Sequence, residues 1–222
     1  MKIKFYGTRG SVPVPQKNHM KVGGDTSCVL VIFEDNNLMI LDAGTGIRKL
    51  GNDIISGKYG SDDNIDILLS HTHWDHIQGF PFFTPGYIKN YTINIFLSGI
   101  EKRRRNLKTV FETVMQSDFF PVPLNKMGAK FIFREPVESY KFLGGNYQIS
   151  ASKHNHPGGA YAYRIEENNK VLVYCTDVEH TEEVDEDVVE FCKNADLLIH
   201  DAQYTPEEIK THKGWGHSAW TH

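Results

Sequence analysis

Short apolar runs alternate with polar turns along almost the whole chain. Most runs are five to seven residues long and rich in β-branched and aromatic side chains, as expected of strands. We expect ten strands, at residues 3–7, 27–33, 38–44, 65–70, 92–97, 130–135, 147–152, 160–165, 170–177 and 196–202. The polar stretch "EENNK" between the eighth and ninth runs predicts a hairpin.

Helical periodicity is found in fewer segments. Residues 101–115 place apolar side chains at helical spacing. Residues 185–195 begin with acidic side chains, which stabilise the amino end of a helix, and residues 205–212 begin with a Thr-Pro pair typical of a helix start. No repeat or linker interrupts the pattern, so it predicts one α/β domain over residues 1–222 with a few outer helices.

Composition narrows the class of protein. With 40% hydrophobic and 23% charged residues, the chain is typical of a soluble globular protein, and its net charge of -4 gives no general attraction to nucleic acid. Cys28, Cys175 and Cys192 lie in apolar runs and suggest buried thiols in a reducing compartment. Neither a signal peptide nor a membrane-length apolar stretch of about 18 residues is seen, so we expect a cytoplasmic protein outside the membrane.

The decapeptide "SHTHWDHIQG" at residues 70–79 concentrates metal-binding side chains directly after an apolar run. His71 and His73 can converge on one ion from a tight loop. Asp75 and His76 follow at the start of an expected helix and can face a second point nearby. Imidazoles combined with a carboxylate suit zinc or manganese better than calcium. The cluster therefore predicts a metal site at the edge of a sheet, where α/β proteins place their sites.

One loop cannot close two metal sites, so further ligands must come from elsewhere in the chain. Five candidates lie at strand ends or between strands: His154, His156, Asp177, Asp201 and His217. Taken singly, an aspartate after a strand is more often a cap or turn residue. Together with the first cluster, these residues indicate a larger site.

These motifs resemble a known family. "HTHWDH" matches the HxHxDH signature of the metallo-β-lactamase fold. "HPGGAYAYRI", "YCTD", "LLIHDAQY" and "HKGWGHSAW" resemble its phosphodiesterase branch, which includes ribonuclease Z and cyclic-nucleotide phosphodiesterases, as do "GTRGSVPVP", "GGDTSCVLV", "LDAGTGIRKLG" and "MQSDFFPVPL". The resemblance runs through nearly the whole chain and is more specific for fold and metal use than for substrate.

The resemblance implies an αβ/βα sandwich of two mixed sheets with outer helices, and a centre holding two divalent ions, Zn or Mn. It implies that one ion is bound by His71, His73 and His156. The other ion would be bound by Asp75 and His76, and Asp177 would bridge the two ions. His154 lies two residues from the matching position, so we expect it to support the site or to face the substrate.

The resemblance also assigns catalytic roles. Asp75 would orient the attacking water, His217 would donate a proton to the leaving alkoxide, and Asp201 would orient the ring of His217. A metal-ligand role for His217 is the alternative. Asp42 is expected to hold the metal-binding loop, and the glycines of "DAGTG" are expected to form a turn, since the phosphate-loop pattern is absent.

The function implied is hydrolysis of a small anionic phosphodiester, with 3′,5′-cyclic nucleotides favoured, by a homodimer. The alternative is a transfer-RNA 3′-processing endonuclease, whose substrate would be RNA. RNA is less favoured as a substrate because the chain lacks a long Gly/Pro-rich insertion and is acidic. A metal-binding sensor module without catalysis is a further alternative. A flavodiiron-like oxygen reductase is disfavoured because it needs a carboxylate in the metal motif, and a β-lactamase because Asp177 stands where those enzymes carry cysteine.

Three other features leave alternatives open. The basic run Lys102, Arg103, Arg104, Arg105 and Lys108 is either a solvated helix face or an attractor of anionic substrate. "SDFFPVPL" either faces substrate or packs over the core. In the family, the last ligand of the second ion follows one more helix and strand beyond "GHSAWTH". We therefore expect the chain to lack that ligand and strand, and to hold the second ion more weakly, since His222 at a chain end is a poor substitute.

Overall fold

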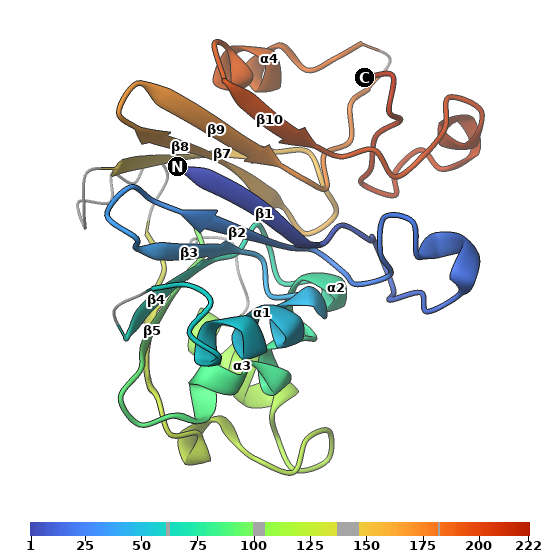
Figure 1. Cartoon of the computed structure of the whole chain (residues 1–222). Helices are drawn as coiled ribbons and strands as arrows, with labels where there is room; N and C mark the ends of the chain where they lie inside the picture. The colour runs from blue at the N-terminus through green and yellow to red at the C-terminus, as the bar shows by residue number, and fades with distance from the viewer. Residues whose placement is uncertain (61–62, 100–104, 137–146, 182) are drawn as a thin grey trace. The chain divides into compact units, whose positions relative to one another are not determined.

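The computed structural model describes residues 1–60, 63–99, 105–136, 147–181 and 183–222. The chain divides into two compact units, residues 1–136 (unit 1) and 137–222 (unit 2). Each unit is built on its own mixed sheet flanked by helices, so the α/β class and the two mixed sheets predicted from the sequence are confirmed (Figure 1). The prediction that residues 1–222 form a single domain stays a prediction.

Unit 1 contains a six-stranded sheet in which every strand pairs with its neighbour in the sequence. The strands are β1 (Lys2–Gly7), β2 (Cys28–Ile32), β3 (Leu38–Leu41), β4 (Asn64–Leu68), β5 (Thr92–Phe96) and β6 (Lys130–Arg134). The pairs β1–β2 and β2–β3 are antiparallel, and the pairs from β3 to β6 are parallel. Parallel strands need helical crossovers, which explains why the helices of this unit lie on one face of the sheet (Figure 1).

The helices of unit 1 are α1 (Gly46–Ile55), α2 (Trp74–Ile77) and α3 (Leu107–Val114), and its 3-10 turns are η1 (Lys17–His19), η2 (Phe80–Phe82), η3 (Thr84–Tyr87) and η5 (Leu124–Lys126). Sequence reasoning did not predict α1, whose two glycines weaken its helical signal. Ile47, Leu50 and Ile54 nonetheless form a buried stripe at helical spacing and pack into the core of the sheet.

Unit 2 contains a four-stranded sheet in the order β10-β9-β8-β7. Its elements are β7 (Tyr147–His154), β8 (Ala160–Glu167), β9 (Lys170–Cys175), α4 (Glu186–Cys192), β10 (Leu197–His200) and the 3-10 turn η6 (Glu208–Thr211). The expected hairpin is β8–β9, and its turn residues Asn168 and Asn169 both have positive φ, at 48° and 60°. Val188 of α4 packs against Val173 and Cys175 of β9 in a small core.

All ten predicted apolar runs contain a strand, whereas two helix predictions need correction. Residues 101–104 of the predicted helix 101–115 lie outside the described residues, and α3 covers 107–114. Residues 205–212 form only the short turn η6. The expected capping is nevertheless present, because the Glu208 amide donates to Thr205 Oγ1 and the Thr205 amide donates to Glu208 Oε2.

Of the basic run, Lys102, Arg103 and Arg104 lie outside the described residues. Arg105 is exposed and donates to Thr113, and Lys108 pairs with Glu112 at 3.6 Å in the next turn of α3. For these two residues the structure shows a solvated helix face.

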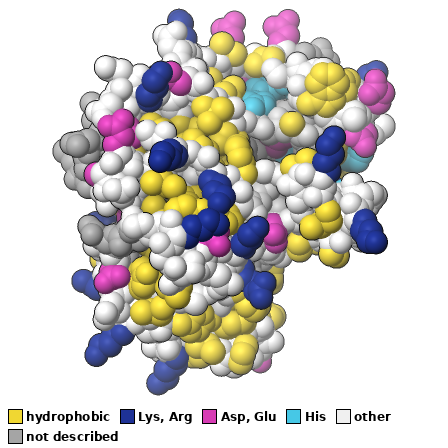
Figure 2. Space-filling model, in the orientation of Figure 1, with side chains coloured by type: hydrophobic (Ala, Val, Ile, Leu, Met, Phe, Trp, Pro, Cys, Tyr) yellow, Lys and Arg dark blue, Asp and Glu magenta, His cyan; other side chains and the backbone are white. Residues whose placement is uncertain are grey.

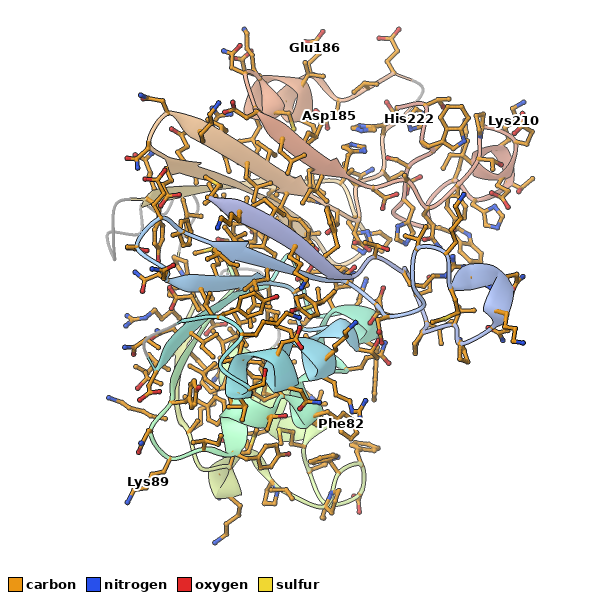
Figure 3. All side chains as sticks on the ribbon, viewed as in Figure 1. Phe82, Lys89, Asp185, Glu186, Lys210 and His222 are labelled. Atoms are coloured by element: carbon orange, nitrogen blue, oxygen red, sulfur yellow. The ribbon has the colours of Figure 1, made fainter. Side chains whose placement is uncertain are left out.

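The segment "SDFFPVPL" combines both expected environments. Phe120, Val122 and Leu124 pack against the core of unit 1, while Phe119 is 62% exposed. Phe82 is also exposed and contacts Phe120 with ring centroids 5.5 Å apart (Figure 3). Of the three thiols, Cys28 and Cys175 are buried as expected, whereas Cys192 is only half-buried. Within the described residues, no helix combines the length and apolarity that crossing a membrane requires.

Candidate active site

In unit 1, the loop that follows β4 is held by Asp42, a fully buried carboxylate at the end of β3. Asp42 Oδ1 accepts the backbone N–H of Ser70 at 2.7 Å, and Asp42 Oδ2 accepts Nδ1–H of His76 at 2.8 Å. A carboxylate accepts here, so His76 carries a proton on Nδ1, and in the neutral ring Nε2 has the lone pair. As predicted, Asp42 therefore holds the histidine-rich loop and fixes a ring orientation that suits a metal ligand.

The side chains of this loop converge. The ring of His71 lies 4.4 Å from that of His73 and 4.2 Å from that of His76 between centroids. His76 Nε2 lies 3.4 Å from Asp75 Oδ2, and the same oxygen accepts the backbone N–H of Ser11 at 2.8 Å. In the neutral ring both atoms present lone pairs, and a cation between them would make them favourable neighbours. We call Asp42, His71, His73, Asp75 and His76 the unit 1 cluster.

Gly44 allows this loop to approach the turn after β3. A Cβ on Gly44 would lie 2.4 Å from the carbonyl oxygen of Asp75, which is far inside van der Waals contact. Gly44, the first glycine of "DAGTG", is therefore needed for the close packing of two loops. The segment is a turn, as expected.

In unit 2, His156 has the same kind of support as His76. His156 Nδ1–H donates to the carbonyl oxygen of Gly216 at 2.8 Å, which leaves Nε2 as the nitrogen that could bind an ion. Glu179 holds the acceptor in place, because its carboxylate accepts the backbone N–H groups of both Gly214 and Gly216. A Cβ on Gly216 would lie 2.3 Å from His156 Nδ1, so only glycine permits this hydrogen bond.

Asp177, Asp201 and His217 lie together at the ends of β9 and β10 and in the segment that follows. His217 Nδ1 donates to Asp201 Oδ2 at 2.7 Å and lies 3.8 Å from Asp177 Oδ1. Asp201 also accepts the backbone N–H groups of Asp177 and Ser218. One ligand atom of each of the three residues falls within 4.8 Å of the others, so they could hold an ion. We call His156, Asp177, Asp201 and His217 the unit 2 cluster.

The bond between His217 and Asp201 bears on both roles considered for His217. An ion bound at Nδ1 would have to displace the short hydrogen bond to Asp201. Nε2 is the nitrogen of the ring that could exchange a proton or bind an ion. This carboxylate–imidazole pair is the arrangement expected of an oriented acid–base histidine.

His154 is buried rather than exposed toward a substrate. Its Nε2–H donates to the carbonyl oxygen of Thr176 at 3.0 Å, and burial lowers the pKa of the ring to about 4. It is therefore neutral and holds the residue that precedes Asp177. Of the two expected roles, the structure favours support of the site.

The predicted site residues thus fall into one cluster in each unit. Sequence reasoning missed two contributors: Glu179 and the backbone carbonyl of Gly216. Glu179 carries no motif that points to its role, because a carboxylate that accepts amides from a loop 35 residues away has no local signal. Gly216 lies in the quoted "HKGWGHSAW", but its oxygen could not be assigned without coordinates.

Comparison with known proteins places the fold. Residues 37–222 match the family model described as the beta-lactamase superfamily domain. The chain belongs to this superfamily. The ribonuclease Z of Haloarcula marismortui is 23% identical over 270 residues, which cover 98% of this chain and 79% of that protein. The ribonuclease Z of Prochlorococcus marinus strain NATL2A is also 23% identical, over 100% of this chain and 81% of that protein.

Solved structures of the superfamily agree. The short form of human tRNase Z matches 100% of this chain and 85% of its own, with a TM-score of 0.72 and 19% identity. A diphosphatase of the PhnP family matches 99% of this chain and 78% of its own, with a TM-score of 0.66 and 19% identity. The predictions of a metallo-β-lactamase fold of the phosphodiesterase branch, and of a metal-dependent hydrolase, are confirmed.

Proposed function

We propose that this superfamily member hydrolyses small phosphodiesters with two divalent ions, Zn or Mn, and that 3′,5′-cyclic nucleotides are its substrates. The proposed ligands are those implied by the sequence motifs: for one ion His71, His73 and His156, for the other Asp75 and His76, and as the bridge Asp177. A homodimer in the cytoplasm remains the proposal for assembly and location.

The observation that carries the proposal is that hydrogen bonds from protein acceptors orient the imidazole rings of His76 and His156. His76 and His156 each donate Nδ1–H to a protein acceptor, one to a carboxylate and one to a carbonyl. Metal-binding histidines in proteins are held in this way, because the outer hydrogen bond fixes the tautomer and the ring orientation. The donor set of imidazoles and carboxylates also suits Zn or Mn. The residues present therefore fit the metal ions that the superfamily implies.

The residues around the metals would perform the remaining chemistry. When bound, two divalent ions lower the pKa of water toward neutrality and neutralise charge on the phosphate. Asp75, which the Ser11 amide holds by one oxygen, would orient the attacking water. His217 would give a proton to the leaving oxygen from Nε2, and Asp201 would hold the ring and stabilise its charged form.

The second candidate function is transfer-RNA 3′ processing. The matches to two proteins named ribonuclease Z favour it over a metal-binding sensor module. The acidic net charge of -4 and the absence of a long Gly/Pro-rich insertion favour the small substrate.

A substrate panel tests the proposal. The purified chain is assayed with bis-p-nitrophenyl phosphate, cyclic mononucleotides, a transfer-RNA precursor and a β-lactam, with and without added Mn²⁺ or Zn²⁺. We expect metal-dependent hydrolysis of the first two. Preferential cleavage of the precursor would replace the proposal by the second candidate, and metal binding without any hydrolysis would support a sensor.

A further inference from the structure

An aromatic row in unit 2 leads from the surface to His217. Tyr204 and His212 are stacked, with ring centroids 4.6 Å apart and planes 25° from parallel. His212 contacts Trp215 edge to face at 5.0 Å, and Tyr204 contacts His217 edge to face at 6.0 Å. The row is therefore Trp215, His212, Tyr204 and His217. Its last member is the proposed proton donor.

The backbone around Trp215 is held by hydrogen bonds, although Trp215 itself is 63% exposed. The residues on either side of it, Gly214 and Gly216, both donate their backbone N–H to the carboxylate of Glu179. The backbone N–H of Trp215 donates to the His212 carbonyl, and His212 Nδ1–H donates to the Glu208 carbonyl at 2.7 Å. An indole displayed on an anchored loop loses little further entropy when a planar group stacks on it.

The same loop carries cationic side chains. Lys210 and Lys213 line a cavity of about 460 Å³. Its other lining residues are Asn155, the neighbour of His156, and Glu179, His180, Thr181, Ile209 and His222. Lys210 lies on η6, and His222 belongs to the same unit (Figure 3). At the upper right of Figure 2, hydrophobic side chains lie near basic, acidic and histidine side chains. Aromatic faces combined with nearby cations are the chemistry that binds single nucleotides and unpaired nucleic acid.

We propose that Trp215 is the stacking surface for the nucleobase of a nucleotide phosphodiester, and that the row from Trp215 through Tyr204 places the scissile phosphate toward His217. This inference rests on the proposed phosphodiesterase function and deepens it, because it makes the nucleobase a recognised part of the substrate. Trp215 is a specificity-determining residue that touches the base and takes no part in proton transfer.

Two esters with the same leaving group test the proposal. Thymidine 5′-p-nitrophenyl phosphate carries a base, and methyl p-nitrophenyl phosphate does not. We expect Trp215→Ala to raise KM for the thymidine ester about tenfold, because stacking on one aromatic residue contributes roughly 5- to 100-fold to affinity, and to leave the methyl ester unchanged. Trp220→Ala is the matched control, since Trp220 lies in the same unit and is 65% exposed. An equal loss for both esters, or no loss for either, overturns the proposal.

A binding measurement separates this proposal from the proposed function. Adenosine 5′-monophosphate is titrated into metal-free wild type, Trp215→Phe and Trp220→Phe while tryptophan fluorescence is recorded. We expect quenching in wild type and in Trp220→Phe, and its loss in Trp215→Phe. This result stands even if neither ester is hydrolysed, in which case the proposed function fails alone. Equal quenching in all three proteins, or none in wild type, refutes stacking on Trp215.

Discussion

At the scale of single residues, the site depends on acceptors that fix imidazole rings. Asp42, the Gly216 carbonyl and Asp201 each accept a hydrogen bond from Nδ1 of a different histidine: His76, His156 and His217. Each ring then presents Nε2. The sequence motifs indicated the three histidines and two of the acceptors, Asp42 and Asp201. They did not indicate the Gly216 carbonyl, because a backbone oxygen 60 residues from its histidine has no sequence signal.

Loss of the Asp42 carboxylate should weaken metal binding without removing a ligand. Asp42→Asn keeps the volume of the side chain but replaces one anionic oxygen by an amide. Outer hydrogen-bond partners of metal-binding histidines contribute about 10- to 100-fold to affinity, so we expect a loss of that size. Isothermal titration with Mn²⁺ or Zn²⁺ measures it. Asp35→Asn on the exposed turn before β3 is the control, and affinity equal to wild type in Asp42→Asn would contradict the role of the carboxylate.

Metal content should separate a ligand from a proton donor. We expect His71→Ala and Asp177→Ala to lose bound metal and hydrolysis together, since both are proposed ligands. We expect His217→Ala to retain metal and to lose turnover by at least about 100-fold, as is typical for removal of a general acid. Elemental analysis of the purified variants, with His19→Ala as a control outside both clusters, measures this. A metal-depleted His217→Ala would make that residue a ligand.

His180 should make stability depend on pH. Burial, and then the neighbouring imidazoles of His200 and His222, lower the pKa of His180 from its ordinary value. As pH falls, His180 therefore binds a proton in the unfolded chain before it does so in the folded chain. Folding stability is lost as pH falls below about 6.5. We expect His180→Gln to lose less stability than wild type between about pH 7.5 and pH 5. Urea unfolding in EDTA measures the difference. His154 shifts in the same direction, and it is present in both proteins.

At the scale of elements, strands were easier to predict than helices. A buried strand is a compact apolar run, and all ten such runs contain strands. Helix α1 was not predicted because Gly46 and Gly51 lower the intrinsic helix propensity of this segment. Tertiary contacts stabilise the helix instead. The turn η6 was overestimated because good capping residues at Thr205 and Glu208 do not by themselves extend a helix. Tertiary packing, which the local pattern does not encode, decides both cases.

The junction between the β3 turn and the metal-binding loop should be intolerant of a single methyl group. Gly44→Ala would place a Cβ 2.4 Å from the Asp75 carbonyl oxygen and 2.4 Å from Thr26 Oγ1. We expect it to destabilise the protein by at least about 2 kcal/mol, because the backbone atom cannot move without shifting the loop. Gly60→Ala is the control, since among the described residues no atom beyond its chain neighbours would lie within 4 Å of the added Cβ. Thermal unfolding that is equal for both variants would exclude this packing constraint.

At the scale of the whole molecule, the metals should stabilise the folded chain. An ion that binds only the native state adds about 2.7 kcal/mol when its concentration is about 100 times Kd. We expect Mn²⁺ or Zn²⁺ to raise the melting temperature of EDTA-treated wild type, and to raise that of His71→Ala much less. Differential scanning calorimetry measures both. The same shift in the two proteins would show that the ions stabilise the chain through other residues.

The order of the strands has a consequence for biosynthesis. Every strand in both sheets lies beside its neighbour in the sequence, so each can join the sheet as it leaves the ribosome. Unit 1 can therefore complete its sheet and its histidine cluster while unit 2 is still being translated. His217 is the last of the proposed site residues to emerge. On the proposed assignment, a nascent chain that ends at Asp177 would carry every proposed metal ligand and would still lack the proton donor.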